Sequence, residues 1–140
     1  MIMKSRNDQL ADVIRITRSL EKNASGIDCH KLYSRFCSTT QEPVRLAAAL
    51  RGFFRLSAPS DQQDVYAAYL RKRIRPAAEA VIVMDDMDAL EQMEALGWLD
   101  AALTDYFLQL SCHHGKTAAM VWLLHLKNKK YGFQDRSFEL

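Results

Sequence analysis

Cysteine and histidine side chains are numerous enough in this chain to ligate a zinc ion. The residues concerned are Cys29, His30, Cys37, Cys112, His113 and His114. Zinc sites usually contain ligand pairs separated by about two to four residues, and no pair here has that spacing. Adjacent side chains on a helix also point in different directions. We therefore expect no metal and no other cofactor, with Cys37 and Cys112 in the core and His113-His114 in a polar turn.

Cys112 beside His113 also has the composition of a cysteine–histidine nucleophile pair. Catalysis would need the imidazole within hydrogen-bond reach of a partly exposed thiol, together with a site for the oxyanion. Neighbours in sequence seldom meet that geometry, and neither a nucleophile elbow nor a Gly-rich loop surrounds this pair. We therefore expect that the protein is not an enzyme.

Three aspartates, Asp85, Asp86 and Asp88, lie close together in a pattern that superficially resembles a calcium loop. An EF-hand loop also needs a central glycine and a distal bidentate glutamate, and both are missing at the required spacing. Carboxylates are favoured at the N-cap and in the first turn of a helix, where the helix dipole stabilises negative charge. The pattern therefore predicts the start of a helix.

The strongest charge feature is the basic patch Arg71, Lys72, Arg73 and Arg75, with Lys127, Lys129 and Lys130 as a second cluster. Both clusters lie at the C-terminal ends of predicted helices, where cations interact favourably with the helix dipole. If both clusters lay on one face of the protein, they would hold phosphates. The basic patch is therefore the basis of an alternative function, a nucleic-acid-associated helical protein.

Composition indicates one folded helical domain. The chain has 140 residues, of which 49% are hydrophobic and 26% charged, and its formal net charge is only +2. This near-balance argues against a strongly basic nucleic-acid binder and against an acidic DNA mimic. The start of the chain turns polar before a signal peptide could form, and no apolar run reaches the roughly 18–20 residues of a membrane span. We expect a cytoplasmic protein with three free cysteines.

Helical periodicity dominates the first half of the chain. Apolar residues recur at three- and four-residue intervals in residues 8–22, as in Leu10, Val13, Thr17 and Leu20. Further helices are predicted over residues 28–37, 43–56, from 60 up to a break or kink at Pro76, and 77–84. Thr39 or Thr40 is the expected cap of the third helix, and Ser60-Asp61-Gln62-Gln63 has the pattern of a capping box. Residues 81–84 would also suit a strand, but the chain offers no partner strand.

Residues 86–129 have the pattern helix, turn, helix, turn, helix, with the turns at 95–97 and 113–115. An offset of 30 residues superimposes two helix pairs between residues 76 and 129. The matched residues are Met120 with Leu90, Leu123 with Met93, Leu126 with Leu96, Ala119 with Ala89, Leu108 with Ala78, and Ser111 with Val81. Because Leu123 and Leu126 recur in both pairs, we expect them to be buried.

The segment from Leu103 to Leu124 resembles the helix-turn-helix core of an ankyrin-type repeat, with a Gly break at 115 and a closing Leu-Leu pair. Ankyrin units are slightly longer, about 33 residues, and open with a Thr-Pro-Leu-His signature that is missing here. The chain is also similar to a group of uncharacterised bacterial proteins built from short helical pairs that end in an ankyrin-like unit. The carriers of that similarity are residues 45–47, 65–71, 86–90, 96–97, 115–118 and 123–128. Ala118 departs from the group, which commonly has an acidic residue there.

The sequence and these resemblances together predict an all-α fold of about seven or eight short antiparallel helices. Its C-terminal half would be an ankyrin-like helical-repeat stack. The expected organisation is one domain, 1–140, with N-terminal helices in 1–40, a helical hairpin in 41–75, ankyrin-like repeats in 76–130 and a tail in 131–140.

Such repeats stack into binding surfaces and rarely carry chemistry, so the resemblance implies a protein–protein interaction module. The expected contact residues line the inter-helix turns: Asp85, Asp86, Gly97, Trp98, Asp100 and Thr104. An alternative role for Trp98, which the sequence favours at least equally, is packing between two adjacent helices. The partner would be another protein. Besides nucleic-acid association through the basic patch, a further alternative is a small stand-alone inhibitor or adaptor, for example phage-encoded, that docks on a larger enzyme.

Overall fold

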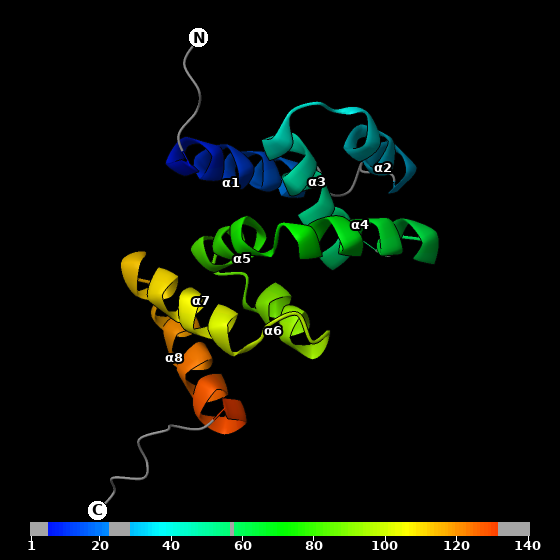
Figure 1. Ribbon diagram of the computed structural model, residues 1–140. Coiled ribbons are helices and arrows are strands. Elements are labelled where there is room, and N and C mark those ends of the chain that lie inside the picture. The colour runs from blue at the N-terminus through cyan, green and yellow to red at the C-terminus, as the bar shows by residue number, and fades with distance from the viewer. Residues whose placement is uncertain (1–5, 23–28, 57, 132–140) are drawn as a thin grey trace, which may run out of the picture. The chain divides into compact units, whose positions relative to one another are not determined.

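The computed structural model describes residues 6–22, 29–56 and 58–131, and these residues are helical with short connections (Figure 1). The helices are α1 (Arg6–Lys22), α2 (Cys29–Ser38), α3 (Glu42–Phe54), α4 (Ser60–Lys72), α5 (Ile74–Val83), α6 (Met87–Ala95), α7 (Ala101–His113), α8 (Thr117–Leu126) and the π-helix η2 (Lys127–Tyr131). Within the described ranges there is no strand. The all-α prediction is confirmed, and residues 81–84 belong to a helix and its end.

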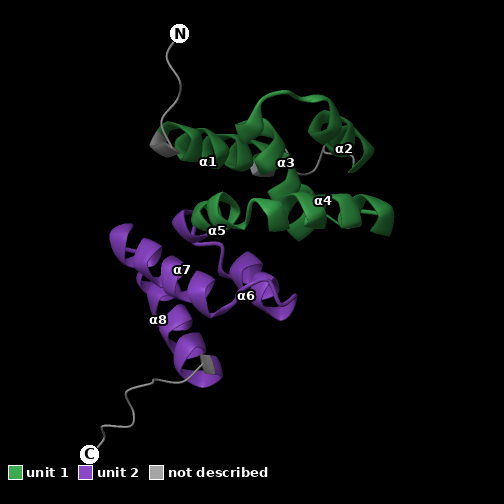
Figure 2. Ribbon diagram, viewed as in Figure 1, with its two compact units in different colours: residues 1–80 green, residues 81–140 purple. Residues whose placement is uncertain are grey.

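The chain divides into two compact units, residues 1–80 and 81–140, shown in green and purple in Figure 2. The boundary falls inside α5, whose residues up to Ala80 belong to the first unit. Two compact units can belong to one domain, so the single domain expected from the sequence stays a prediction.

In unit 1, α3 is the central helix and packs against α1, α2 and α4. Its sequence explains this position, because alanine is the best helix former and its small side chain lets neighbouring helices approach closely. Ala47, Ala48 and Ala49 are fully buried, with Leu46 and Leu50 beside them. Gly52 is also buried and lies directly against the ring of Tyr66. The core of this unit is therefore built around α3.

Aromatic rings connect α2 to α4. The Phe36 ring centroid lies 5.0 Å from that of Tyr66 and 5.1 Å from that of Tyr69, both in edge-to-face geometry. Tyr33 meets Tyr66 edge-on at 5.7 Å. Such pairs stabilise by about 0.5–1.5 kcal/mol beyond the area that they bury. These contacts hold α2 in place although it has only ten residues.

Three helices end in the same type of turn, at Asp85, Gly97 and Gly115, whose φ angles are 58°, 78° and 68°. After each of these residues, the next N–H donates to a carbonyl five residues earlier: Asp86 to Val81, Trp98 to Met93 and Lys116 to Ser111. This is the Schellman arrangement, which satisfies carbonyl groups that a helix end leaves unbonded. The predicted turns at Gly97 and Gly115 are confirmed.

The 30-residue offset is visible in helix limits and in burial. α6 begins at Met87 and α8 at Thr117. Ala89 and Ala119 are each 1% exposed, and Met93 and Leu123 are each 0% exposed. Leu126, however, is only half-buried, and its counterpart Leu96 is exposed. The predicted burial is therefore confirmed for Leu123 and wrong for Leu126, which lies at the last turn of its helix.

Several predicted helix ends are wrong. The N-cap of α3 is Gln41, not Thr39 or Thr40, and it makes no side-chain cap bond. Pro59 is the N-cap of α4, so Ser60 is already helical and the capping-box prediction is wrong. The break before α5 occurs at Arg73, and Pro76 lies in the first turn of α5, where a missing N–H costs nothing. Val65 of α4 is 41% exposed although its side chain is apolar.

Candidate functional site

The predicted contact residues of unit 2 divide into a buried and an exposed group. Trp98 is 8% exposed and Thr104 is fully buried, so neither presents a side chain to a partner. The burial of Trp98 agrees with the packing role left open for it. Gly97 and Asp100 are exposed at the turns. The Asp100 carboxylate accepts a hydrogen bond from the Leu103 N–H at 2.7 Å and thereby caps α7.

The aspartates at the start of α6 have separate structural roles. Asp86 is the N-cap, and its carboxylate accepts from the Ala89 N–H at 3.2 Å, while Asp88 lies in the first turn. The prediction that the three aspartates start a helix is confirmed for Asp86 and Asp88 and wrong for Asp85. Asp85 instead occupies the left-handed position of the preceding turn, and its carboxylate pairs with the Lys116 ammonium at 3.2 Å.

The two basic clusters are partly neutralised by ion pairs. In the first cluster, the Arg73 Nε lies 2.6 Å from Glu42 Oε1, and the guanidinium stacks 4.3 Å from the Tyr69 ring centroid. Arg71 and Lys72 are exposed in the last turn of α4, and Arg75 is exposed too. In the second cluster, Lys127 pairs with Asp105 at 2.9 Å and Lys130 with Glu94 at 2.7 Å. The free positive charge in each cluster is smaller than the sequence suggests.

The cysteines do not lie in the core as predicted. Cys37 and Cys112 are exposed, because each follows a buried residue, Phe36 or Ser111, and the next position on a helix points about 100° away. The ring centroids of His113 and His114 lie 5.1 Å apart in edge-to-face geometry. His113 is the last residue of α7, and His114 follows it. Among the residues that the structure describes, no group of three or more His, Cys, Asp or Glu side chains could hold a metal ion.

A groove of about 540 Å³ runs along the C-terminal helices of unit 2. It is lined by Glu94 of α6, by Trp122, His125 and Leu126 of α8, and by Lys129 and Lys130 of η2. Trp122 is half-buried, so part of its indole is available to a bound molecule. The second oxygen of Glu94, Oε1, is buried and has no hydrogen-bond partner in the described part of the chain. The groove thus combines an aromatic and aliphatic surface with a charged rim.

Two large apolar side chains are exposed on α8 beside this groove, on a face that also carries the polar Thr117 and His125. Val121 is 50% and Leu124 46% exposed. The whole helix, TAAMVWLLHL, has Thr117 and His125 as its only polar side chains. A helix that is apolar all round is normally buried on every side. Periodicity could not reveal this face, because a uniformly apolar helix carries no signal for which side is covered.

Comparisons of the chain with protein families, with curated proteins and with solved structures find no match. In the described ranges, no helix has both the length and the apolar character needed to cross a bilayer.

Proposed function

We propose that this chain is a non-enzymatic protein–protein interaction module whose last helices form an ankyrin-like pair of stacked hairpins. The equivalent turns at Asp85 and Gly115 support the repeat, since they share φ sign and hydrogen-bond pattern. The ion pair between Lys116 and Asp85 joins one of these turns to the other. Adjacent turns along one edge are a feature of stacked helical repeats.

The single observation that carries the proposal is the exposed apolar face of α8. The terminal unit of a helical-repeat stack needs a polar outer face to stay soluble alone. Here Val121 and Leu124 are about half exposed instead, with the groove at Trp122 and Leu126 next to them. Apolar surface concentrated on one helix marks a binding site, because its burial against a partner is favourable.

The proposed occupant is an amphipathic helix of another protein that has acidic residues beside its apolar face. Helices of this kind bind in apolar grooves through side chains spaced three and four residues apart. The groove rim carries Lys129 and His125, which would meet the acidic residues. The exposed turn residues Asp85, Gly97 and Asp100 are proposed as further polar contacts to the same partner.

Site-specific photo-crosslinking in the native cell tests this surface. A crosslinking amino acid at Leu124 should capture one defined protein, and one at Val65 should not. Val65 is the matched control, because it is 41% exposed against 46% for Leu124 but lies on α4 of unit 1. In purified form, Leu124→Glu should abolish binding of the captured protein, and Val65→Glu should leave binding unchanged. Lys129→Glu should weaken it, increasingly at low salt.

Two results would overturn the proposal. Equal capture from positions 65 and 124 would mean that exposure alone determines crosslinking. Capture of a second copy of this chain, with a dimer in sedimentation that Leu124→Glu dissociates, would make the α8 face a self-association surface. Thermal melts of each variant show that altered binding is not caused by unfolding.

Nucleic-acid association through the exposed Arg71 and Lys72 is the alternative proposal. Phosphate contacts weaken steeply with salt, so a gel shift measured between about 50 and 200 mM salt detects them. Loss of such a shift in Arg71→Glu/Lys72→Glu, but not in Leu124→Glu, would favour this alternative.

A third proposal is an inhibitor or adaptor that docks on a larger enzyme. It predicts that the protein captured at Leu124 is an enzyme whose activity changes on binding.

A further inference from the structure

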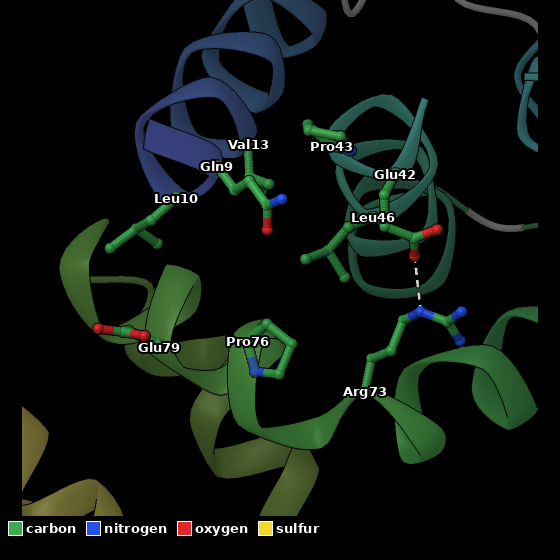
Figure 3. Close-up of a pocket in the computed structure, with 9 residues that line it drawn as sticks. All are labelled: Gln9, Leu10, Val13, Glu42, Pro43, Leu46, Arg73, Pro76 and Glu79. Atoms are coloured by element: carbon green, nitrogen blue, oxygen red, sulfur yellow. Dashed lines mark ion pairs between the residues drawn. The ribbon is translucent and has the colours of Figure 1, made fainter. Parts of the chain in front are cut away.

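A cavity of about 140 Å³ lies within unit 1, lined by residues of α1, α3 and α5 and by Arg73 (Figure 3). Figure 3 shows the ion pair between Glu42 and Arg73 on one side of this cavity and Glu79 on the other. Glu79 also interacts with the protein around it, and the cavity is open to solvent. Its lining therefore selects no ligand by charge. The exposed face of α8 differs from this cavity, because the chain contains a covered counterpart of that face.

The covered counterpart is α6. The offset of 30 residues places Glu94 of α6 at the position of Leu124 in α8. The Glu94 side chain is only 18% exposed, because it lines the groove with Trp122 of α8 and pairs with Lys130 of η2. Leu124 is 46% exposed. The position in α6 is thus covered by the hairpin that follows it, α7 packed against α8, whereas the equivalent position in α8 is uncovered.

Two ion pairs define how α8 lies beside α6. The carboxylate of Asp85, in the turn before α6, lies 3.2 Å from the ammonium of Lys116, the N-cap of α8. The carboxylate of Glu94, in the last turn of α6, lies 2.7 Å from the ammonium of Lys130, which follows α8 in η2. Because the starts of the two helices adjoin and their ends adjoin, α6 and α8 run in the same direction.

The outward-facing residues of the two helices differ in charge. A stripe of three acidic residues on α6, spaced three residues apart, corresponds to three uncharged, apolar residues on α8. The stripes are Asp88, Glu91 and Glu94 on α6 and Ala118, Val121 and Leu124 on α8. The terminal helix of a stack that faces only water needs a polar outer surface. The loss of all three charges at the exposed end of the stack therefore indicates a surface that becomes covered.

The described part of the chain adds no further hairpin over α8. Gly97, which follows α6, has a φ angle of 78° and begins the connection to α7. Lys127 occupies the equivalent position after α8. Its φ angle is −59°, and the chain continues helically into η2. A hairpin that covers the face of α8 in the way that α7 and α8 cover α6 would therefore belong to another molecule.

From this correspondence we infer that the face of α8 is a stacking position for one more helical hairpin, supplied by the partner protein. The second helix of that hairpin lies on α8 as α8 lies beside α6, in the same direction. It places apolar side chains against Val121 and Leu124, where α8 and η2 present a lysine to Glu94. This inference rests on the proposed function and specifies the fold and orientation of the partner. A single amphipathic helix can bind in either direction, so orientation separates the two cases.

Photo-crosslinking from the two ends of α8 measures this orientation. A crosslinking amino acid replaces Ala118 or Leu124, which are both exposed, and the captured peptide is identified by mass spectrometry. Both positions should capture one helix of the partner, and the residue captured from position 118 should precede the residue captured from position 124. That helix should be the second of two helices joined by a short turn. Val65 on α4 is the control position, from which no capture is expected.

A matched pair of substitutions tests the apolar stripe with the purified captured protein. Ala118→Asp restores on α8 the charge that α6 carries, and it should weaken binding several-fold. Asp88→Ala makes the reverse change at the equivalent position of α6 and should leave binding unchanged. Thermal melts of both variants exclude unfolding as the cause.

The outcomes separate this inference from the proposed function. Capture in the reverse order, capture of a helix with no helix before it, or equal effects of Ala118→Asp and Asp88→Ala would overturn the inference and leave the proposed function standing. Absence of capture from both positions would overturn the proposed function and the inference with it.

Discussion

Asp85 and Gly115 occupy the same position in two turns of this chain, thirty residues apart. Their φ angles are 58° and 68°, and in both cases the following N–H bonds to a carbonyl five residues earlier. Glycine adopts this left-handed conformation without penalty, whereas for most other residues it costs about 1–2 kcal/mol. One of the two turns therefore stores strain that the other avoids, and the Asp85–Lys116 ion pair offsets part of it.

Replacement of Asp85 by glycine should stabilise the protein by roughly 0.5–1 kcal/mol, because the relieved backbone strain exceeds the value of an exposed ion pair. Gly115→Ala should destabilise it by about 1 kcal/mol through backbone strain alone, since a Cβ there meets no atom within 4 Å. Urea unfolding measures both. Asp85→Asn is the control, because it removes the charge and still tolerates the conformation. If Asp85→Gly is less stable than Asp85→Asn, strain at this position is negligible.

Met93 and Leu123 should be of similar importance to stability. Both are fully buried, so Met93→Ala and Leu123→Ala should each lower the free energy of unfolding by about 2–5 kcal/mol. Leu124→Ala, at the neighbouring exposed position, should change it by less than about 0.5 kcal/mol. An unchanged thermal midpoint for Leu123→Ala would contradict the placement of α8 described above.

Gly52→Ala should destabilise unit 1 although alanine is the better helix former. The gain in helix propensity is about 1 kcal/mol. The added methyl group, however, would overlap the Tyr66 ring, which is 1% exposed and packs against the rings of Tyr33 and Phe36. Overpacking of this kind costs about 1–3 kcal/mol, so a net loss is expected in chemical unfolding. In a Tyr66→Leu background the ring is absent, and Gly52→Ala should then be neutral or stabilising. Destabilisation of equal size in both backgrounds would exclude the overlap as the cause.

Alkaline pH should destabilise the protein through its buried tyrosines. Burial raises the pKa of Tyr69 above its ordinary value of 10.0, and the hydrogen bond to Glu42 and the charge of Glu42 raise it further, although Arg73 and Arg45 oppose them. Burial likewise raises the pKa of Tyr66. Below pH 10 both tyrosines are neutral in the folded and unfolded states. Above pH 10 the unfolded state loses protons first, so stability falls as pH rises towards the folded-state pKa.

Thermal melts between pH 8 and pH 11.5 measure this decline. Tyr69→Phe should flatten the pH dependence by about half, because Tyr66 still contributes. At neutral pH the same variant should lose about 1 kcal/mol with the hydrogen bond to Glu42, whose side chain is 48% exposed and therefore well solvated. An alkaline decline that is identical in wild type and Tyr69→Phe would assign it to other groups.

The elements that the sequence predicted correctly have local signals. Asp86 and the glycines at 97 and 115 mark helix ends by their own side-chain chemistry or conformational freedom, and apolar spacing predicted α1 to within two residues. The contacts around the unit 1 cavity have no such signal. Tyr69 and Glu42 are 27 residues apart, and they meet only because α3 and α4 pack together. The α8 face escaped prediction for the opposite reason, since apolar residues occur on every side of that helix.

The central position of α3 also bears on how fast unit 1 folds. Its packing partners α1, α2 and α4 are each separated from it in sequence by one helix at most. Contacts between nearby segments require only short loops to close, and helical proteins of this kind reach their native state in microseconds to milliseconds. A transition state organised around α3 would make folding rates most sensitive to substitutions at Ala48 and Leu50. Changes in the outer part of α2 would chiefly accelerate unfolding.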